Sequence, residues 1–213
     1  MKKPLLLTSA LIAVGFCSSF FPAAIEGQAQ MARFGVVMGK TTSDQLWTPS
    51  VGTASRDGYL VGGFAEVGLS GESVSVRVEG DYVQRGAIVE RDSEGAPVAG
   101  EIRTEYLSFA LHVKLSKSIG PLSLHIALGP TIDQLLRNRS TPVLEQVLNE
   151  KKTTSLGIGL GGGFSLHLFD SLIPEFDIRL TEGLSDAYIG SFTTVRNRSL
   201  ELLLRFGVPR SLS

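Results

Sequence analysis

Three histidines are the residues of this chain best suited to acid–base or metal chemistry. His112, His125 and His167 each fall on the polar side of a segment in which polar and apolar residues alternate. An imidazole beside a serine can act as a general base, and three imidazoles can bind a metal ion. No serine-containing nucleophile elbow accompanies them. We therefore favour hydrogen bonding in a packed polar interior over a catalytic or metal-binding role.

A glycine-rich run offers a second kind of chemistry. Residues 157–162 read Gly-Ile-Gly-Leu-Gly-Gly and match the dinucleotide-binding fingerprint. That fingerprint requires a helix to begin at the glycines, so that its N-terminus meets the pyrophosphate. Here the run continues into alternating residues 163–167, which indicate a strand. Glycines on the inner face of a narrow barrel leave space for large side chains opposite, and we favour this interpretation.

The segments that carry these residues alternate with a period of two, which is typical of strands. In residues 74–82, every second residue is apolar or glycine and the residues between are polar. The pattern predicts eight strands, the first, second and sixth being less regular: 33–40, 59–69, 74–82, 107–115, 122–128, 156–169, 174–180 and 200–206. Many have nine residues or more, which suits a tilted membrane crossing better than a soluble sheet.

The predicted connections alternate between long and short. Residues 40–58, 85–103, 131–154 and 183–196 are long, whereas residues 70–73, 116–121 and 170–171 form short turns. Outer-membrane barrels combine short periplasmic turns with long external loops and an even number of strands. The sequence therefore predicts an all-β fold: a single closed, eight-stranded, antiparallel, up-and-down transmembrane β-barrel. Both termini should lie in the periplasm of a Gram-negative bacterium.

The two faces of these strands predict which side meets lipid. The apolar set is almost entirely Leu, Val, Ile and Phe and should point outward, as in a membrane barrel. The polar set carries both charges and should pair inside a narrow lumen that side chains fill. This predicted lumen network comprises Glu66, Arg77, Glu79, Asp81, His112, Lys114, His125, His167, Glu175, Asp177, Arg179, Glu201 and Arg205.

The first residues resemble an export signal. Lys2 and Lys3 precede an apolar stretch that ends near Phe21, and small residues at 27 and 29 suit a signal peptidase. We expect residues 1–29 to be a signal peptide and residues 30–213 the barrel domain. A retained anchor is the alternative, which the short apolar stretch disfavours. Cys17 is the only cysteine, so a mature chain would have neither disulfides nor thiolate metal ligands.

The balance of charged residues limits the classes of partner that we expect. Lys plus Arg number 20 against 21 for Asp plus Glu, which gives no overall charge that favours nucleic acid. We expect no cofactor. The expected partners are outer-membrane lipid, the barrel-assembly machinery during insertion, and a protein partner at the external loops, with the barrel itself a monomer.

Two further features concern the ends of the barrel. Residues 141–148 predict a short helix in the longest loop, either a lid packed on the barrel mouth or a contact site for a partner, and we favour the lid because so short a helix is marginal alone. Tyr59 and Tyr82 at the external ends of their strands, and Phe206 at the periplasmic end, could belong to the aromatic girdles.

Most of the mature chain resembles the PorT-type outer-membrane β-barrel domain family. The resemblance is carried by the order and spacing of residues 62–64, 78–86, 106–114, 128–130, 157–164, 175–184 and the strand after 196–198. It implies an eight-stranded outer-membrane barrel with no catalytic residues, and a secretion role in a few relatives. One departure is that the chain continues past Phe206, whereas barrels of this kind often finish on an aromatic residue.

Four functions are compatible with the predicted barrel and its residues. The first is a non-enzymatic structural or interaction barrel that presents its external loops. The others are an accessory protein of an envelope secretion system, a lipid-modifying barrel enzyme that uses His125 and a serine, and a soluble lipocalin-like binder with inverted faces.

Overall fold

The computed structural model describes residues 30–70, 73–91, 94–142, 144, 150–167, 171–189 and 194–212. The expected signal peptide, residues 1–29, lies outside these ranges, as do parts of several connections. No helix in the described ranges is long and apolar enough to cross a membrane.

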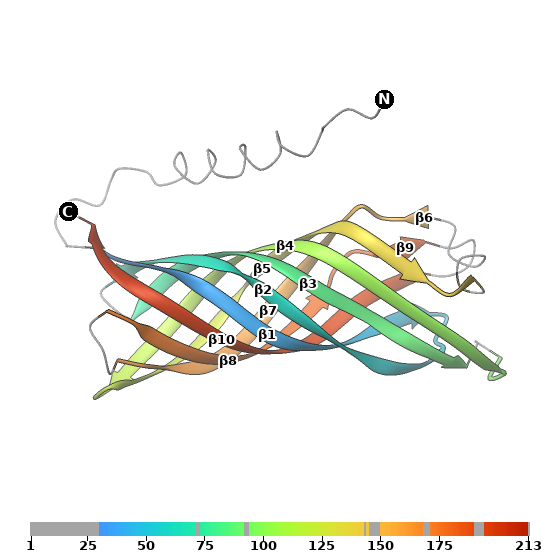
Figure 1. Cartoon of the computed structure of the whole chain (residues 1–213), viewed down its shortest axis with the longest axis horizontal. Helices are drawn as coiled ribbons and strands as arrows, with labels where there is room; N and C mark the ends of the chain where they lie inside the picture. The colour runs from blue at the N-terminus through green and yellow to red at the C-terminus, as the bar shows by residue number, and fades with distance from the viewer. Residues whose placement is uncertain are drawn as a thin grey trace, which may run out of the picture.

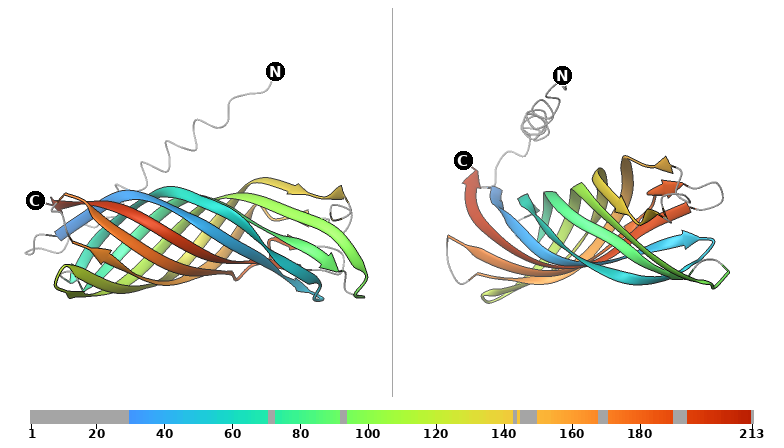
Figure 2. Two further views of the ribbon diagram at one scale, coloured as in Figure 1. Left: turned by 60° about the horizontal axis from the view of Figure 1, so that its bottom comes forward. Right: turned by 45° about the vertical axis from the view of Figure 1, so that its right-hand side comes forward.

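Eight long strands form one antiparallel ring (Figures 1 and 2). They are β1 (Gln30–Thr48), β2 (Gly52–Ser70), β3 (Val74–Arg91), β4 (Pro97–Ile119), β5 (Leu122–Ser140), β7 (Thr154–Leu166), β8 (Ile173–Gly183) and β10 (Thr194–Leu212). Each long strand pairs with the next along the chain. Two short strands, β6 (Glu150–Lys151) and β9 (Tyr188–Ile189), extend the sheet at one end. The predicted all-β, eight-stranded, up-and-down barrel is confirmed.

The ring closes where β1 meets β10. Their register runs without a break from Gln30 opposite Leu212 to Thr48 opposite Thr194. Closure gives the backbone groups of both strands partners, which hydrocarbon requires. The start of β1 and the end of β10 share one end of the barrel with the three short turns. We call it the short-turn end, and the opposite end, where β1–β2 and β3–β4 are joined, the hairpin end.

The strands at the hairpin end are longer than the sequence predicts. Residues 40–58 were expected as a loop, yet β1 continues to Thr48 and β2 begins at Gly52. The strand pattern was traced along the apolar outer residues, which stop at Met38. Past this point the outer residues become polar, beginning with Lys40, while inner residues such as Ser43 remain buried and keep the ladder intact. β3, β4, β5 and β10 also extend beyond their predicted bounds.

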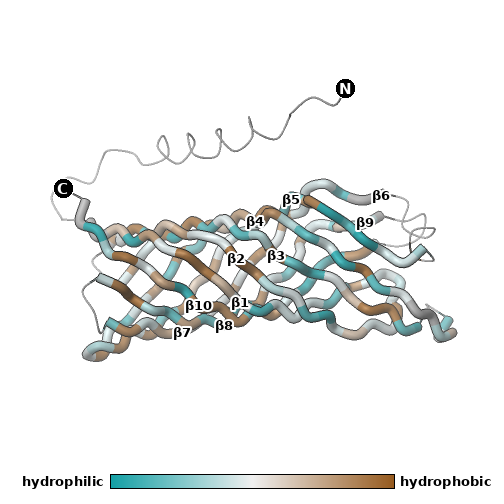
Figure 3. Tube along the Cα trace, in the orientation of Figure 1, coloured by the Kyte–Doolittle hydropathy of each residue, from teal (hydrophilic) through white to brown (hydrophobic). Residues whose placement is uncertain are grey.

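The two faces of the wall have the predicted chemistry. Leu111 and Ile178 are each 49% exposed on the outside, whereas Arg77 is 2% and Lys114 3% exposed in the interior. Apolar and polar residues accordingly alternate along the strands (Figure 3). A soluble binder needs the reverse arrangement, so the lipocalin-like alternative is wrong.

The aromatic residues expected at the barrel ends lie on the outer wall. The rings of Tyr59 and Tyr82 lie 5.7 Å apart, where the band of apolar outer residues ends on the side of the hairpin end. Phe206 does not end its strand: β10 continues to Leu212, and Phe206 lies between Val36 of β1 and Pro174 of β8.

Candidate functional site

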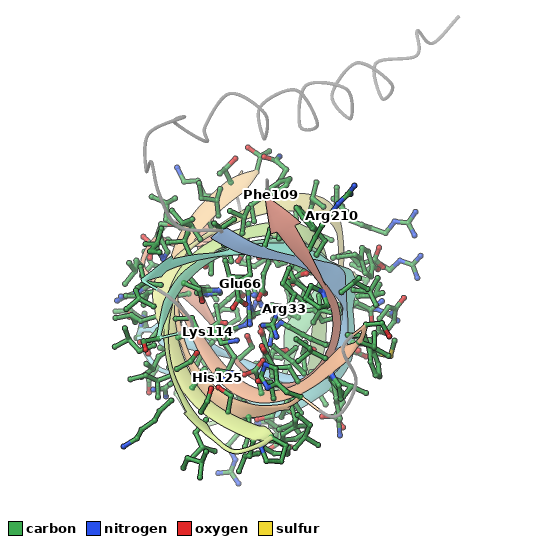
Figure 4. The ribbon with its side chains drawn as sticks, turned by 90° about the vertical axis from the view of Figure 1, so that its left-hand side faces the viewer. Arg33, Glu66, Phe109, Lys114, His125 and Arg210 are labelled. Atoms are coloured by element: carbon green, nitrogen blue, oxygen red, sulfur yellow. The ribbon has the colours of Figure 1, made fainter. Side chains whose placement is uncertain are left out.

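The lumen at the short-turn end is organised around two carboxylates. Glu175 accepts hydrogen bonds from Arg33 at 2.6 Å, from Lys114 at 2.7 Å, and from Arg77. Glu66 accepts from Arg77 at 2.5 Å and from Arg33 at 2.8 Å. Seen from this end, Arg33, Glu66 and Lys114 point into the barrel (Figure 4). Five strands, β1, β2, β3, β4 and β8, are therefore joined across the lumen by hydrogen bonds between ionised groups, which are stronger than neutral ones.

A second group of charges lies further along the lumen. Glu79 accepts hydrogen bonds from Arg179 at 2.5 Å and from Arg205 at 2.7 Å. Arg179 also donates to Glu201 at 2.6 Å and approaches Asp81 at 3.5 Å. All five side chains are buried. Because β3, β8 and β10 alternate with a period of two, every second side chain of each strand points into the lumen, where these charges lie.

Two of the three histidines are buried in the lumen, and the third is exposed. His125 Nε2 contacts Asp177, and His112 Nδ1 lies 4.0 Å from Glu79. Both imidazoles are buried in the lumen. His167 was predicted to join them, and this is wrong: β7 ends at Leu166, and His167 lies exposed after it, with its backbone N–H donated to Pro121 O. The inward pattern was extrapolated one residue beyond the strand.

One group of lumen residues has the composition of a metal site. Ligand atoms of His125, Glu175 and Asp177 all lie within 4.8 Å of one another. The oxygens of Glu175 are occupied by Arg33, Arg77 and Lys114, and Asp177 pairs with Arg205. A divalent ion would meet these cations at short range, so the arrangement fits a closed ion-pair network rather than a metal centre.

The lumen charges nearly balance within the described residues. Six cations, Arg33, Arg77, Arg85, Lys114, Arg179 and Arg205, face seven carboxylates, Glu66, Glu79, Asp81, Asp133, Glu175, Asp177 and Glu201. The sequence prediction missed Arg33, Arg85 and Asp133. Arg85 pairs with Asp133 and, at 3.3 Å, with Glu201. Arg85 and Asp133 were assigned to loops, although each continues the inward parity of its strand.

The glycines of β7 make room for this network. A Cβ on Gly159 would lie 2.9 Å from His112 Nε2, and a Cβ on Gly163 would overlap Asp177 Oδ1 and the backbone of Phe176. The run is a strand and lacks the helix that a dinucleotide site needs. The glycines therefore serve packing across the lumen.

The hairpin end of the lumen is closed by an apolar cluster, which we call the mouth cluster. Its buried residues are Trp47, Val89, Ile102, Leu144, Ala187, Tyr188 and Val195. Burial raises the pKa of Tyr188, whose hydroxyl donates to Asn138 Oδ1 at 2.7 Å. Below the cluster, Gln45 donates to Asn197, which donates to Tyr106. This end of the lumen is thus packed by side chains from strands and connections together.

Part of the predicted loop helix belongs to this closure. Pro142 and Leu144 are helical, and Leu144 is 5% exposed within the mouth cluster. The described part of the segment therefore packs as a lid, and residues 143 and 145–148 lie outside the described ranges.

A lumen cavity beside Arg85 and Asn197 has a volume of about 10 Å³, which is room for about one water molecule.

Comparisons with known proteins agree with this architecture. The family described as outer membrane protein beta-barrel domain matches residues 28–188. The outer membrane protein OprG from Pseudomonas aeruginosa is similar in fold, with a TM-score of 0.54 at 12% identity over 89% of this chain and 100% of OprG. Neisserial surface protein A gives a TM-score of 0.47 at 13% identity, over 81% of this chain and 95% of that one. No curated protein matches the sequence.

The charge network predicts an unequal response to two neutralising substitutions. Glu79→Gln leaves Arg179 and Arg205 short of a buried partner and should lower the free energy of unfolding by about 3–5 kcal/mol. Glu182→Gln removes an exposed partner of Arg198 and should cost about 0–1 kcal/mol. Urea titration of both variants in lipid vesicles measures the difference. Equal losses would contradict the network's structural role.

Proposed function

Because the chain belongs to the outer membrane protein β-barrel domain family, we propose that it is a non-enzymatic barrel that acts through its hairpin end. Its place is the outer membrane of a Gram-negative bacterium. The observation that carries the proposal is the filled lumen: ion pairs occupy one end and the mouth cluster closes the other. A barrel whose lumen is filled by the side chains of its described residues has its outer surface and its two ends left for interaction.

The hairpin end is the better candidate for an interaction surface. There the strands rise past the apolar band, carrying exposed polar residues such as Lys40, Glu90 and Arg139. Rigid strands that present variable connections are a common arrangement for binding. We place this end outside the cell and both termini in the periplasm, since outer-membrane barrels have short turns on the periplasmic side. A protein partner would bind here.

The position of the histidines supports a role without catalysis. A lipid-modifying enzyme needs its base at the surface where lipid arrives. His125 has a fully buried side chain and contacts Asp177, and His112 is 2% exposed. Neither imidazole has a route to substrate in the part of the chain that the structure describes.

A secretion-accessory role is supported only by the resemblance to PorT-type barrels. It requires a stable envelope complex. Co-purification from crosslinked cells would separate this role from that of an isolated surface barrel.

The filled lumen predicts that the barrel does not conduct ions. In planar bilayers with 1 M potassium chloride, the wild-type barrel should give no stable conductance steps, because buried ion pairs and the mouth cluster leave no continuous water path. The conducting control is a porin reconstituted in the same lipid. Reproducible steps from the wild-type protein would contradict a closed barrel.

Single cysteines test the orientation, since the only natural cysteine is Cys17. Arg91→Cys, at the end of β3, should react with a membrane-impermeant maleimide on intact cells. Lys117→Cys, near the β4–β5 turn, should react only after the outer membrane is permeabilised. Both positions are exposed, so accessibility to water is matched. The reverse labelling pattern would overturn the proposed topology.

A further inference from the structure

The lumen cavity beside Arg85 and Asn197 lies where the ion pairs give way to the mouth cluster. Along β10, the inward residue Val195 belongs to the mouth cluster and Glu201 to the ion pairs. Asn197 and Ser199, which lie between them on the same face, line the cavity. The cavity therefore occupies the boundary between the charged and the apolar part of the lumen.

Two glycines create the space. Gly157 of β7 and Gly183 of β8 lie directly opposite each other, and both line the cavity. A Cβ on Gly183 would lie 3.0 Å from the backbone oxygen of Asn197. The remaining lining residues all carry polar groups and are Arg85, Asp133, Ser155, Thr181, Ser185, Asn197 and Ser199. Such a lining suits a polar occupant.

Three polar atoms of the lining residues have no hydrogen-bond partner in the described part of the chain. They are Arg85 Nε, Asp133 Oδ1 and Thr181 Oγ1. Their residues are only 2%, 5% and 4% exposed. The other polar atoms of the first two are in use, because Arg85 Nη1 pairs with Asp133 Oδ2 and Arg85 Nη2 lies 3.3 Å from Glu201. A buried polar atom left without a partner is costly, so each of the three needs one.

The size of the cavity limits what can supply these partners. Its volume of about 10 Å³ accommodates one particle of the size of a water molecule. A sugar, a phosphate or any larger polar molecule does not fit. The possible occupants are therefore a single atomic ion or one water molecule.

The chemistry of the three atoms distinguishes between these occupants. Arg85 Nε–H requires an acceptor, whereas Asp133 Oδ1 requires a donor, and the Thr181 hydroxyl can act as either. A sodium ion would bind the two oxygens but would lie against the guanidinium. A chloride ion would accept from Arg85 but would lie against the carboxylate. Water alone both donates and accepts.

We propose that this cavity is the site of one structural water molecule. The water accepts a hydrogen bond from Arg85 Nε and donates to Asp133 Oδ1 and Thr181 Oγ1. It thereby joins β3, β5 and β8 at a level where Thr181 has no direct side-chain bond to the ion pairs. Gly183 and Ser185 are half-buried, so the water exchanges past the end of β8. The site depends on the lumen alone and does not rest on the proposed function.

A high-resolution crystal structure of the mature barrel tests the occupant. One density peak should lie about 2.7–3.2 Å from each of the three atoms, which is hydrogen-bonding distance. Crystals grown with rubidium or bromide salts should show no anomalous peak at this position. A cavity without density, or an anomalous signal from either ion, would overturn the proposal.

Two substitutions at position 181 test the role of the water bond. Thr181→Val keeps the shape of the side chain and removes the hydroxyl, whereas Thr181→Ser keeps the hydroxyl and removes the methyl group. If the water bond stabilises the barrel, Thr181→Val should lower the urea midpoint by about 0.5 M, and Thr181→Ser by clearly less. Equal midpoints, or a lower midpoint for Thr181→Ser, would show that the residue acts by packing alone and would contradict the proposal. Neither result bears on binding at the hairpin end, so this test can fail while the proposed function stands.

Discussion

The closure of β1 on β10 is the constraint on which the rest of the structure depends. Hydrocarbon offers no water to satisfy backbone N–H and C=O groups, so a sheet can enter it only as a ring without edges. An unbroken register between these two strands provides that ring. Once the ring is closed, each strand has one side toward lipid and one toward a narrow lumen. The period of two then assigns every residue to one or the other.

A narrow ring also determines what the lumen must contain. Eight strands leave space that side chains just fill. Inward positions carry both charges, and each buried charge needs a partner, because an isolated one is costly to bury. Glu175 and Glu79 each connect cations from several strands, which ties distant parts of the ring together. At the hairpin end the same positions become apolar and pack with Leu144 and Tyr188 into a closed mouth. The barrel is thus filled in two different ways along its length.

Much of this could be predicted from residue alternation, because a membrane barrel repeats one simple pattern. The inward direction of Arg77, Lys114 and Asp177 followed from parity alone. The pairing of Arg85 with Asp133 did not, since both residues lie beyond the ends of the predicted strands. His167 was misplaced for the opposite reason, as parity was carried beyond the end of β7. Which cation contacts which carboxylate depends on register and shear between strands, and a single sequence does not contain that information.

The direction of the two faces is the central claim, and tryptophan fluorescence tests it directly. Phe64 and Phe109 occupy opposite faces of the barrel wall, being 6% and 41% exposed. In a Trp47→Phe background, Phe109→Trp should be strongly quenched by lipids brominated on their acyl chains, and Phe64→Trp should be quenched little. Equal quenching of the two, or stronger quenching at position 64, would show that the charged face is not the enclosed one.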